Sequence, residues 1–488
     1  MQEVVAVARE HEPVELDASA VDAMRQSRHV VRDLVDGDRR VYGINTGYGE
    51  MKDVAIPRSE LQTQQLNLLR SHNVTVGTPF PEEVVRAAIL IRANVLAQGY
   101  SGVRVELVEA LIALLNSGVH PVLRKGGSTD NAAGLANVGL VLSGAGEASL
   151  EGETVPGGTA LERADLEPLT LQPKEGLALI SGTATMTALL SLGVNDAARL
   201  IDTADMSGAW VFELIGKQPG AFDPDVAAVH PQPGQETSAA NVRALIGNGA
   251  VSTHMSQDPL SIRCIPQIHG AARQFLGIAK ETVETELESV TDNPLVFPDG
   301  RVLSNGNFNG QHLATAADAL GGVMLNLGRA SEQRFARLLE GAEGIPVQLT
   351  ERSGPEMGLS RLQYAAASLI TEAASSGSPS GQSLVTAAGQ EDIHAVGNIA
   401  GMELRDLIER VRHVVAMELL GAARATSFDS SVSDPIERLY ESFTAAVNIP
   451  NGDASWSPRV DAAVEYLQSP AHTDTIAELL PTEGSSTQ

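Results

Sequence analysis

The chain is organised around one glycine-rich stretch, KGGSTDNAAG, at residues 125–134. Its small and polar residues cannot continue the helical patterns on either side, so we expect a loop. Upstream, residues 81–118 alternate apolar and charged positions at helical spacing, and downstream an apolar run covers 135–142. Several glycines between two predicted helices permit the tight backbone geometry of a functional loop, although an ordinary connection between helices would have the same pattern.

The composition disfavours several classes of partner. The 488 residues suffice for two or three domains, and 34 basic against 61 acidic side chains leave a net charge of −27. Such a surface disfavours nucleic acid and anionic membranes, so we expect neither as a partner. The chain has only five lysines, and arginine supplies the other basic side chains. This balance is typical of a halophilic source, or of an acidic cytosolic enzyme from a GC-rich genome.

Cysteine usage and hydropathy indicate a cytoplasmic protein without a metal site. The single cysteine, Cys264, excludes an intrachain disulfide and a cysteine-based zinc site. The first residues lack the basic segment and long apolar run of a signal peptide. No uninterrupted apolar run reaches the roughly 20 residues that a membrane span requires.

The remaining pattern predicts a mainly α-helical protein. Long segments at 312–343 and 385–425 are rich in alanine, nearly free of proline and periodic as helices are, so they suit close packing in a bundle. We predict an N-terminal domain over 1–205 that carries the glycine-rich loops. A central helical bundle with C-terminal helices is expected over 206–480, followed by a disordered tail at 481–488.

Nine short motifs occur in order along the chain. They are YGINTGYG at 42–49, SH at 71–72, GYSGVR at 99–104, KEGLAL at 174–179, QDP at 257–259, SIR at 261–263, DNPL at 292–295, GNF at 306–308 and QED at 390–392. Together they resemble the histidine/phenylalanine ammonia-lyase family over nearly the whole chain. The resemblance implies a long antiparallel central helical bundle with a smaller N-terminal domain, a histidine ammonia-lyase-like or fumarase-aspartase-like architecture. It also implies a homotetramer whose active sites combine loops from several subunits around a small-molecule substrate.

One position departs from the family where its chemistry is centred. Family members eliminate an amine from an α-amino acid without an added cofactor, because an Ala-Ser-Gly triad cyclises into a methylidene-imidazolone electrophile. Here Ser128, Thr129 and Asp130 stand in that place, on a stretch about two residues shorter than the family pattern. Ring closure is easiest at glycine, so we expect no ring and no other cofactor. Ser181 and Leu260 also replace an asparagine and a tyrosine of the family, which indicates a site rebuilt without the electrophile.

Three further residues match positions that act in the family's reaction. Tyr42 matches the tyrosine thought to remove the β-proton, a role for which a phenol with a pKa near 10 needs a nearby cation or strong hydrogen bonds. Arg263 matches the arginine that pairs with the substrate carboxylate, since a planar guanidinium suits bidentate binding. His72 matches an active-site histidine. Loop packing, a structural salt bridge and capping by Ser71 are the respective alternatives.

Five other residues are candidates for substrate contact, and one of them, Glu391, is also a catalytic candidate. Glu391 matches an acidic position that, in histidine-specific members, contacts the amine or imidazole, and a carboxylate there would also attract a quaternary ammonium group. His394 follows one helical turn later and could join the pocket. Phe308 could line an aromatic pocket or simply pack in the core. Gln257 and Asn45 are possible hydrogen-bonding partners of the substrate.

These residues favour a carbon-nitrogen lyase that gives a urocanate-like unsaturated acid. The leading hypothesis is a protein similar to ergothionase, a ring-less relative that eliminates trimethylamine from a thiolated histidine betaine, because a quaternary amine leaves without the ring's help. One alternative is an ordinary histidine or aromatic amino acid ammonia-lyase that releases ammonia. Another is a different ring-independent reaction on an aromatic or imidazole acid. A non-catalytic binding or regulatory paralogue is disfavoured by the retention of Tyr42 on its glycine loop.

Overall fold

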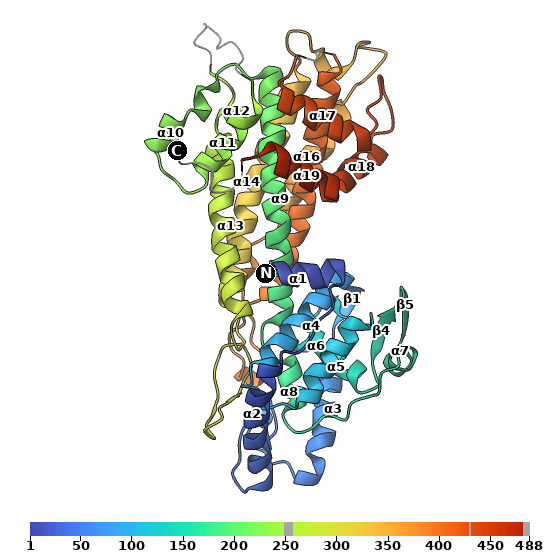
Figure 1. The fold of residues 1–488 in the computed structure, drawn as a ribbon, viewed down its shortest axis with the longest axis vertical. Helices are drawn as coiled ribbons and strands as arrows, with labels where there is room; N and C mark the ends of the chain where they lie inside the picture. The colour runs from blue at the N-terminus through green and yellow to red at the C-terminus, as the bar shows by residue number, and fades with distance from the viewer. Residues whose placement is uncertain (248–256, 429–430, 482–488) are drawn as a thin grey trace. The chain divides into compact units, whose positions relative to one another are not determined.

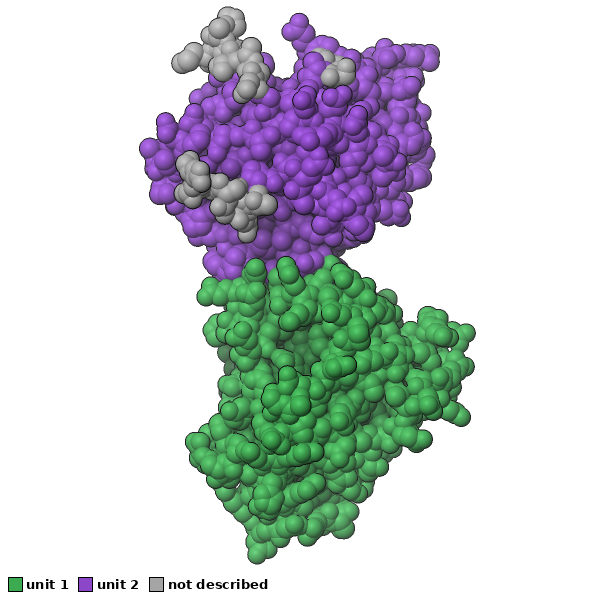
Figure 2. Space-filling view, in the orientation of Figure 1, with its two compact units in different colours: residues 1–193, 279–318, 378–402 green, residues 194–278, 319–377, 403–488 purple. Residues whose placement is uncertain are grey.

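The computed structural model describes residues 1–247, 257–428 and 431–481 (Figure 1). The protein is 63% helical, which confirms the prediction of a mainly α-helical fold. The chain clusters into two compact units, each composed of three segments (Figure 2). Unit 1 comprises residues 1–193, 279–318 and 378–402, and unit 2 comprises residues 194–278, 319–377 and 403–488.

Four long helices contribute residues to both units. They are α9 (Ala184–Ile215), α13 (Ile265–Leu287), α14 (Gln311–Leu339) and α16 (Gly397–Thr426). The segment predicted as helical at 312–343 corresponds to α14. The predicted domain boundary between residues 205 and 206 falls within α9 and stays a prediction. From residue 482 onward, the predicted tail lies outside the described residues.

Unit 1 packs short helices around a core and adds small antiparallel sheets. Its other helices are α1 (Gln2–Val5), a π-helical turn (Ala6–Glu10), α2 (Ala18–Asp36), α3 (Leu61–His72), α4 (Glu82–Ala97), α5 (Val105–Asn116), α6 (Ala132–Leu142), α7 (Gly157–Arg163) and α8 (Glu175–Ile180). Its strands form three antiparallel sheets among the described residues. The first pairs β1 (Val76–Pro79) with β3 (Arg124–Gly126), and the second has the order β2 (His120–Pro121), β4 (Glu147–Leu150), β5 (Glu153–Pro156). The third pairs β6 (Leu295–Val296) with β7 (Val302–Leu303).

Helix α4 is the centre of the unit 1 core. It begins directly after Pro81, and Glu82 and Glu83 occupy its first turn. Acidic side chains are favourable there because they interact with the unpaired N–H groups and with the positive end of the helix dipole. Val84 and Ile91 are among its buried residues, and the helix packs against α2 and α5. The start predicted from the sequence is therefore confirmed. Burial around nearly the whole helix explains its weak amphipathic pattern.

Among its described residues, unit 2 consists of helices and connecting loops and contains none of the strands β1–β7. Besides its shares of the long helices it contains α10 (Pro224–Ala228), α11 (Gln235–Leu245), α12 (Leu260–Arg263), α15 (Ser360–Ser375), α17 (Asp434–Ala446), α18 (Ser457–Gln468) and α19 (Pro470–Leu479). The fully buried Trp210 of α9 packs edge-to-face on Tyr440 and Phe443 of α17, with ring centroids 6.0 and 6.4 Å apart. Aromatic contacts of this kind fix how helices pack.

A group of buried charges joins the long helices inside unit 2. This bundle ion network consists of Asp205, His269, Arg273, Arg334 and Glu418. His269 Nδ1 lies 2.7 Å from Asp205 Oδ1, and Arg334 donates from Nε and Nη2 to the two Glu418 oxygens at 2.5 and 3.0 Å. Ser207 and Ser331 also donate to Glu418. Each carboxylate in the network therefore has a cationic partner and further donors.

One helical stretch is long and apolar enough to be considered as a membrane span. It covers Glu175–Ile215, with a mean hydropathy of 1.7 in its most apolar window. That window is 89% buried inside the fold. It is therefore a core helix, because a membrane span would expose its apolar face to lipid.

Candidate active site

Tyr42 lies on a turn between α2 and α3 that depends on glycine. Gly43 has φ +77°, and a Cβ there would lie 2.7 Å from Leu177 Cδ2, so a larger residue would clash. Asn45 braces the same turn: its Oδ1 accepts the N–H of Val41 at 2.7 Å, and its Nδ2 donates to a preceding carbonyl. Direct contact between Asn45 and a substrate stays a prediction.

The Tyr42 phenol is half-buried and belongs to a small polar group. Its ring packs edge-to-face on Tyr48 at 6.4 Å, and Gln65 Nε2 donates to the Tyr48 hydroxyl at 3.1 Å. Burial raises the pKa of Tyr42, the nearby Glu391 carboxylate raises it further, and a hydrogen bond from the Gly49 backbone opposes both. A phenol in this setting is protonated at neutral pH, so proton abstraction requires a positive charge beside it.

The segment before α16 is a loop, although the sequence predicts a helix over 385–425. The α-helix begins only at Gly397. Ala387 and Ala388 have positive φ values of 47° and 50°, and Gly389 follows with φ +87°. This left-handed run cannot be part of an α-helix, so the prediction is wrong for residues 385–396.

This loop brings two predicted site residues together. It also contacts the segment between α2 and α3 that carries Tyr42, which we call the tyrosine loop. The Thr386 hydroxyl lies 2.9 Å from Glu391 Oε2 and 3.0 Å from His394 Nε2, and Glu391 Oε2 lies 3.8 Å from His394 Nε2. Lys52, on the tyrosine loop, donates to the side-chain oxygen of Gln390. The proximity of Glu391 and His394 thus arises from a folded loop and not from helical spacing.

The glycine-rich stretch connects β3 to α6, so it follows a strand and not the predicted helix. The Ser128 hydroxyl donates to the Asp130 carbonyl at 2.6 Å, and Asp130 Oδ1 accepts the N–H of Ala132 at 3.0 Å. Asn398, at the start of α16, donates from its backbone N–H to the Thr129 carbonyl at 3.3 Å and from Nδ2 to the Asp130 carbonyl. Hydrogen bonds within the stretch and from Asn398 of α16 therefore hold residues 128–130 in place.

Asp130 faces the loop that carries Glu391. Asp130 Oδ2 lies 4.0 Å from His394 Nδ1. Burial raises the pKa of Asp130, a change that Glu391 reinforces, whereas the Ala132 N–H, His394 and His72 lower it. We call the set Asp130, Thr386, Glu391, His394 and Asn398 the loop carboxylate cluster. In the described part of the chain, neither carboxylate of the cluster forms an ion pair with lysine or arginine.

The residues of this segment do not fit the methylidene-imidazolone ring. The ring needs a middle residue that loses its hydroxyl as water to leave a methylidene carbon, but the Cβ of Thr129 carries an additional methyl group. The amide nitrogen of the third residue must also approach the first carbonyl closely, which glycine permits most easily. Asp130 instead brings a Cβ and a carboxylate whose oxygen caps the next helix.

Ser181, the second departure from the family, has structural partners. Its hydroxyl accepts the backbone N–H of Asn293 at 3.1 Å, and its carbonyl accepts from the guanidinium of Arg92. Arg92 is 1% exposed, and burial lowers its pKa to about 10 although Asp292 opposes the change. Ser181 thus joins a buried polar layer of unit 1.

His72 and Phe308 also lie in unit 1. His72 ends α3, and its Nδ1 lies 2.9 Å from the Leu68 carbonyl and 3.1 Å from the Ser71 hydroxyl. The carbonyl contact favours a proton on Nδ1, which leaves Nε2 as an acceptor. Phe308 lies in the turn before α14 and is 41% exposed, so it is no core residue. A role in binding an aromatic ring stays a prediction.

Arg263 and Gln257 lie in unit 2, so neither unit alone contains the whole predicted set. Arg263 is the last residue of the single-turn helix α12, whose position is fixed at two points. Asp258 accepts backbone N–H groups of residues 217 and 218 at 2.8–3.1 Å, and Arg334 Nη1 donates to the Ser261 carbonyl at 3.3 Å. The Arg263 Nε has no hydrogen-bond partner among the described residues. A fixed turn with an unpaired guanidinium nitrogen suits an anionic ligand.

Sequence reasoning missed Asn398 and Thr386. Neither belongs to a motif with a chemical signature, and Asn398 lies within a segment whose alanine-rich helical pattern gives no sign of a site. No signal in the sequence points to Asn398, because the helix predicted over 385–425 places it well inside that helix, whereas the structure places it at the start of α16. Residues near a helix N-terminus often contact neighbouring loops.

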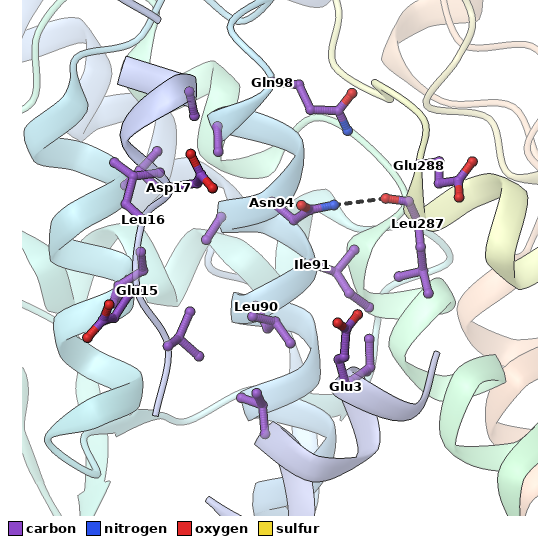
Figure 3. Close-up of a pocket in the computed structure, with 18 of the residues that line it drawn as sticks. Glu3, Glu15, Leu16, Asp17, Leu90, Ile91, Asn94, Gln98, Leu287 and Glu288 are labelled. Atoms are coloured by element: carbon purple, nitrogen blue, oxygen red, sulfur yellow. Dashed lines mark hydrogen bonds between the residues drawn. The ribbon is translucent and has the colours of Figure 1, made fainter. Parts of the chain in front are cut away.

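A cavity of about 900 Å³ lies elsewhere in unit 1 (Figure 3). Its apolar wall includes Leu90, Ile91 and Leu287, and Asn94 Nδ2 donates to the Leu287 carbonyl at 2.8 Å. The acidic residues of its lining are Glu3, Glu12, Glu15, Asp17, Glu284 and Glu288. None of the predicted site residues lines this cavity, and its carboxylates would repel the carboxylate of an amino acid substrate.

Comparison with known proteins agrees with the fold. A family model described as aromatic amino acid lyase matches residues 1–445. The histidine ammonia-lyase of Symbiobacterium thermophilum is 40% identical over 96% of this chain and 95% of its own length. The crystal structure of histidine ammonia-lyase from Trypanosoma cruzi has a TM-score of 0.92 and 32% identity, and covers 99% of this chain and 94% of its own. Ergothionase from Treponema denticola has a TM-score of 0.88 and 24% identity, with 96% of each chain covered.

The chain belongs to the aromatic amino acid lyase family. It is an enzyme of the ammonia-lyase type, and its substrate is a small-molecule amino acid, as for the enzymes of this family. The similarity to ergothionase shows a shared fold alone. The comparisons therefore support an ordinary histidine ammonia-lyase better than the leading hypothesis of an ergothionase-like protein.

Proposed function

We propose that this protein eliminates ammonia from histidine or a closely related imidazole amino acid and gives a urocanate-type acid. The observation that carries the proposal is the meeting of the tyrosine loop with the loop that bears Glu391, so that Tyr42 and Glu391 interact within unit 1. A base and a carboxylate for the imidazole or amine are thus brought together. The identity to a named histidine ammonia-lyase over nearly the full length supports the same substrate class.

Each group has a defined task in this elimination. Tyr42, deprotonated, removes a β-proton, and the electrons of the C–H bond form the Cα–Cβ double bond while the C–N bond breaks. The raised pKa of Tyr42 means that the cationic substrate itself must favour the phenolate. Arg263 binds the substrate carboxylate through its unpaired guanidinium nitrogen. His72 and His394 are available for hydrogen bonds to the imidazole.

A second candidate reaction is the elimination of trimethylamine from a histidine betaine. One observation favours it: Ser128, Thr129 and Asp130 cannot supply the family's electrophile, and a quaternary amine departs without that help. Glu391 and Asp130, which lack lysine or arginine partners among the described residues, would attract its positive charge.

One experiment separates the two reactions. The purified protein is incubated with histidine, its trimethyl betaine and the thiolated betaine, while urocanate-like absorbance, ammonia and trimethylamine are measured. We expect ammonia and urocanate from histidine. Release of trimethylamine alone supports the second candidate, and no product from any of the three overturns both. Intact mass measures the ring separately, because cyclisation would remove two water molecules.

We further propose that the enzyme acts in the cytoplasm as a homotetramer. The resemblance to the histidine/phenylalanine ammonia-lyase family supports assembly, because it implies active sites that combine loops from several subunits. Sedimentation at several protein concentrations tests the tetramer, and mixtures of inactive Tyr42 and Arg263 variants test sharing. Recovery of activity in the mixture is expected if one site takes residues from different subunits.

A further inference from the structure

Asp130 is a carboxylate whose own loop leaves one oxygen available. Oδ1 accepts the Ala132 N–H at the start of α6, whereas Oδ2 lies 4.0 Å from His394 Nδ1. The side chain is half-buried, so water screens its charge only in part. A carboxylate in such a position attracts a cation.

Asn398 provides a second and independent indication of a ligand. Its side chain is 2% exposed, and its Nδ2 donates to the Asp130 carbonyl. Its Oδ1 is buried and has no hydrogen-bond partner among the described residues. Leaving a buried acceptor unpaired costs free energy, and this acceptor belongs to the amide that contacts Asp130. A ligand that satisfies it must carry a hydrogen-bond donor.

We propose that Asp130 and Asn398 bind the α-ammonium group of the substrate, in the place where relatives carry their electrophile. This inference rests on the proposed function and deepens it. It specifies a primary ammonium, because a quaternary ammonium has no N–H to donate to Asn398 Oδ1. The subsite would thus select an ordinary amino acid over a betaine.

The subsite also explains how an amine can leave without the ring. A carboxylate beside the nitrogen keeps the amine protonated. When the base removes the β-proton, the pair of electrons of the C–N bond moves to the nitrogen, and neutral ammonia departs. Asp130 remains a carboxylate throughout, so the protons balance: one passes to the base, and three leave with the nitrogen.

The test compares ligands that lack one charged group each. Histamine has the ammonium but no carboxylate, and imidazolepropionate has the carboxylate but no ammonium. Binding of both, of histidine and of its trimethyl betaine is measured by calorimetry for the wild-type protein, Asp130→Asn and Asp130→Ser. Both replacements can still accept the Ala132 N–H. Asp299→Asn, which changes an exposed aspartate of the β6–β7 turn, is the matched control.

We expect both Asp130 variants to bind histidine and histamine about 10-fold more weakly or worse, a typical effect of losing a charged hydrogen bond. Binding of imidazolepropionate should change less than about 2-fold, and the control should change neither. Equal weakening of both ligand types, no weakening, or tighter binding of the betaine than of histidine in the wild type would overturn the inference. If the wild type converts histidine and the Asp130 variants bind histidine and histamine as tightly as the wild type does, the subsite alone is refuted. If the wild type neither binds nor converts any imidazole ligand, the proposed function is refuted as well.

Discussion

The two groups of charges in this protein are built in opposite ways. In the bundle ion network, the side chains of Asp205, His269, Arg334 and Glu418 are fully buried, and each carboxylate has a cation and further donors. In the loop carboxylate cluster, Asp130 and Glu391 share one histidine neighbour, His394, at 4.0 and 3.8 Å, and a buried amide oxygen has no partner among the described residues. The first group is complete without a ligand, whereas the second is not.

This difference indicates which charges serve the fold and which serve a substrate. A buried ion pair with every partner present contributes to structure, and removing one partner leaves an uncompensated charge. Incompletely paired groups that meet on loops are instead typical of binding sites. The contrast predicts that substitutions in the network change stability and substitutions in the cluster change activity.

The largest expected effect is on catalysis at Tyr42. Tyr42→Phe removes only the hydroxyl, so the edge-to-face contact with Tyr48 is kept. Because loss of a general base typically costs about 10²- to 10⁴-fold in rate, we expect kcat/KM for histidine to fall within that range. The thermal midpoint of unfolding should stay nearly the same. Tyr364→Phe, at a tyrosine that is 63% exposed, is the control and should keep full activity.

The next largest effect is on stability at Glu418. Glu418→Gln leaves the buried guanidinium of Arg334 without a counter-charge, so the free energy of unfolding should fall by about 3–5 kcal/mol. Chemical denaturation followed by circular dichroism measures the change. The double variant Arg334→Met, Glu418→Leu removes both charges and should recover much of the loss. If the single variant were as stable as the wild type, the contrast between the two groups would be wrong.

The sequence predicts most of the fold because local signals and packing agree there. The helical pattern that begins at residue 81 placed the start of α4 correctly, and the helical period found α14. The same reasoning failed at 385–396, where alanine and helical spacing favour a helix. There the bridge between Thr386 and Glu391 and the positive φ values of Ala387 and Ala388 define a loop, and this outcome depends on contacts with distant segments.

The candidate site could be predicted only in part. Motifs supplied Tyr42, Glu391 and the altered segment at 128–130, because their residue types carry recognisable chemistry. They gave Asp130 no role beyond the loss of a ring, since its relation to His394 exists only after folding. Asn398 could not be found at all, because a buried unpaired oxygen is a property of packing and not of residue type.

A smaller effect concerns a buried imidazole of unit 2. His472 has no exposed surface, its Nε2 lies 2.8 Å from the Thr203 hydroxyl, and burial lowers its pKa to about 3. In the unfolded chain this imidazole takes up a proton near pH 6.5, whereas in the folded protein it stays neutral until about pH 3. The free energy of unfolding is therefore fully retained above pH 6.5 and falls as the pH decreases toward 3. The loss is about 1.4 kcal/mol per pH unit within this window. In denaturation curves from pH 7 to 4, His472→Gln should remove this slope and His29→Gln should not.

The smallest expected effect is the change in the free energy of unfolding caused by Asp130→Asn. It tests most directly the contrast between the bundle ion network and the loop carboxylate cluster. Burial raises the pKa of Asp130, so its charged form is less favourable in the folded protein than in the unfolded chain. The neutral asparagine should therefore be at least as stable as the wild type at pH 7. The wild type should gain stability relative to the variant as the pH falls through the raised pKa, because the folded carboxyl then takes up its proton first. A loss above about 1 kcal/mol at pH 7 would instead place Asp130 with the charges that maintain the fold.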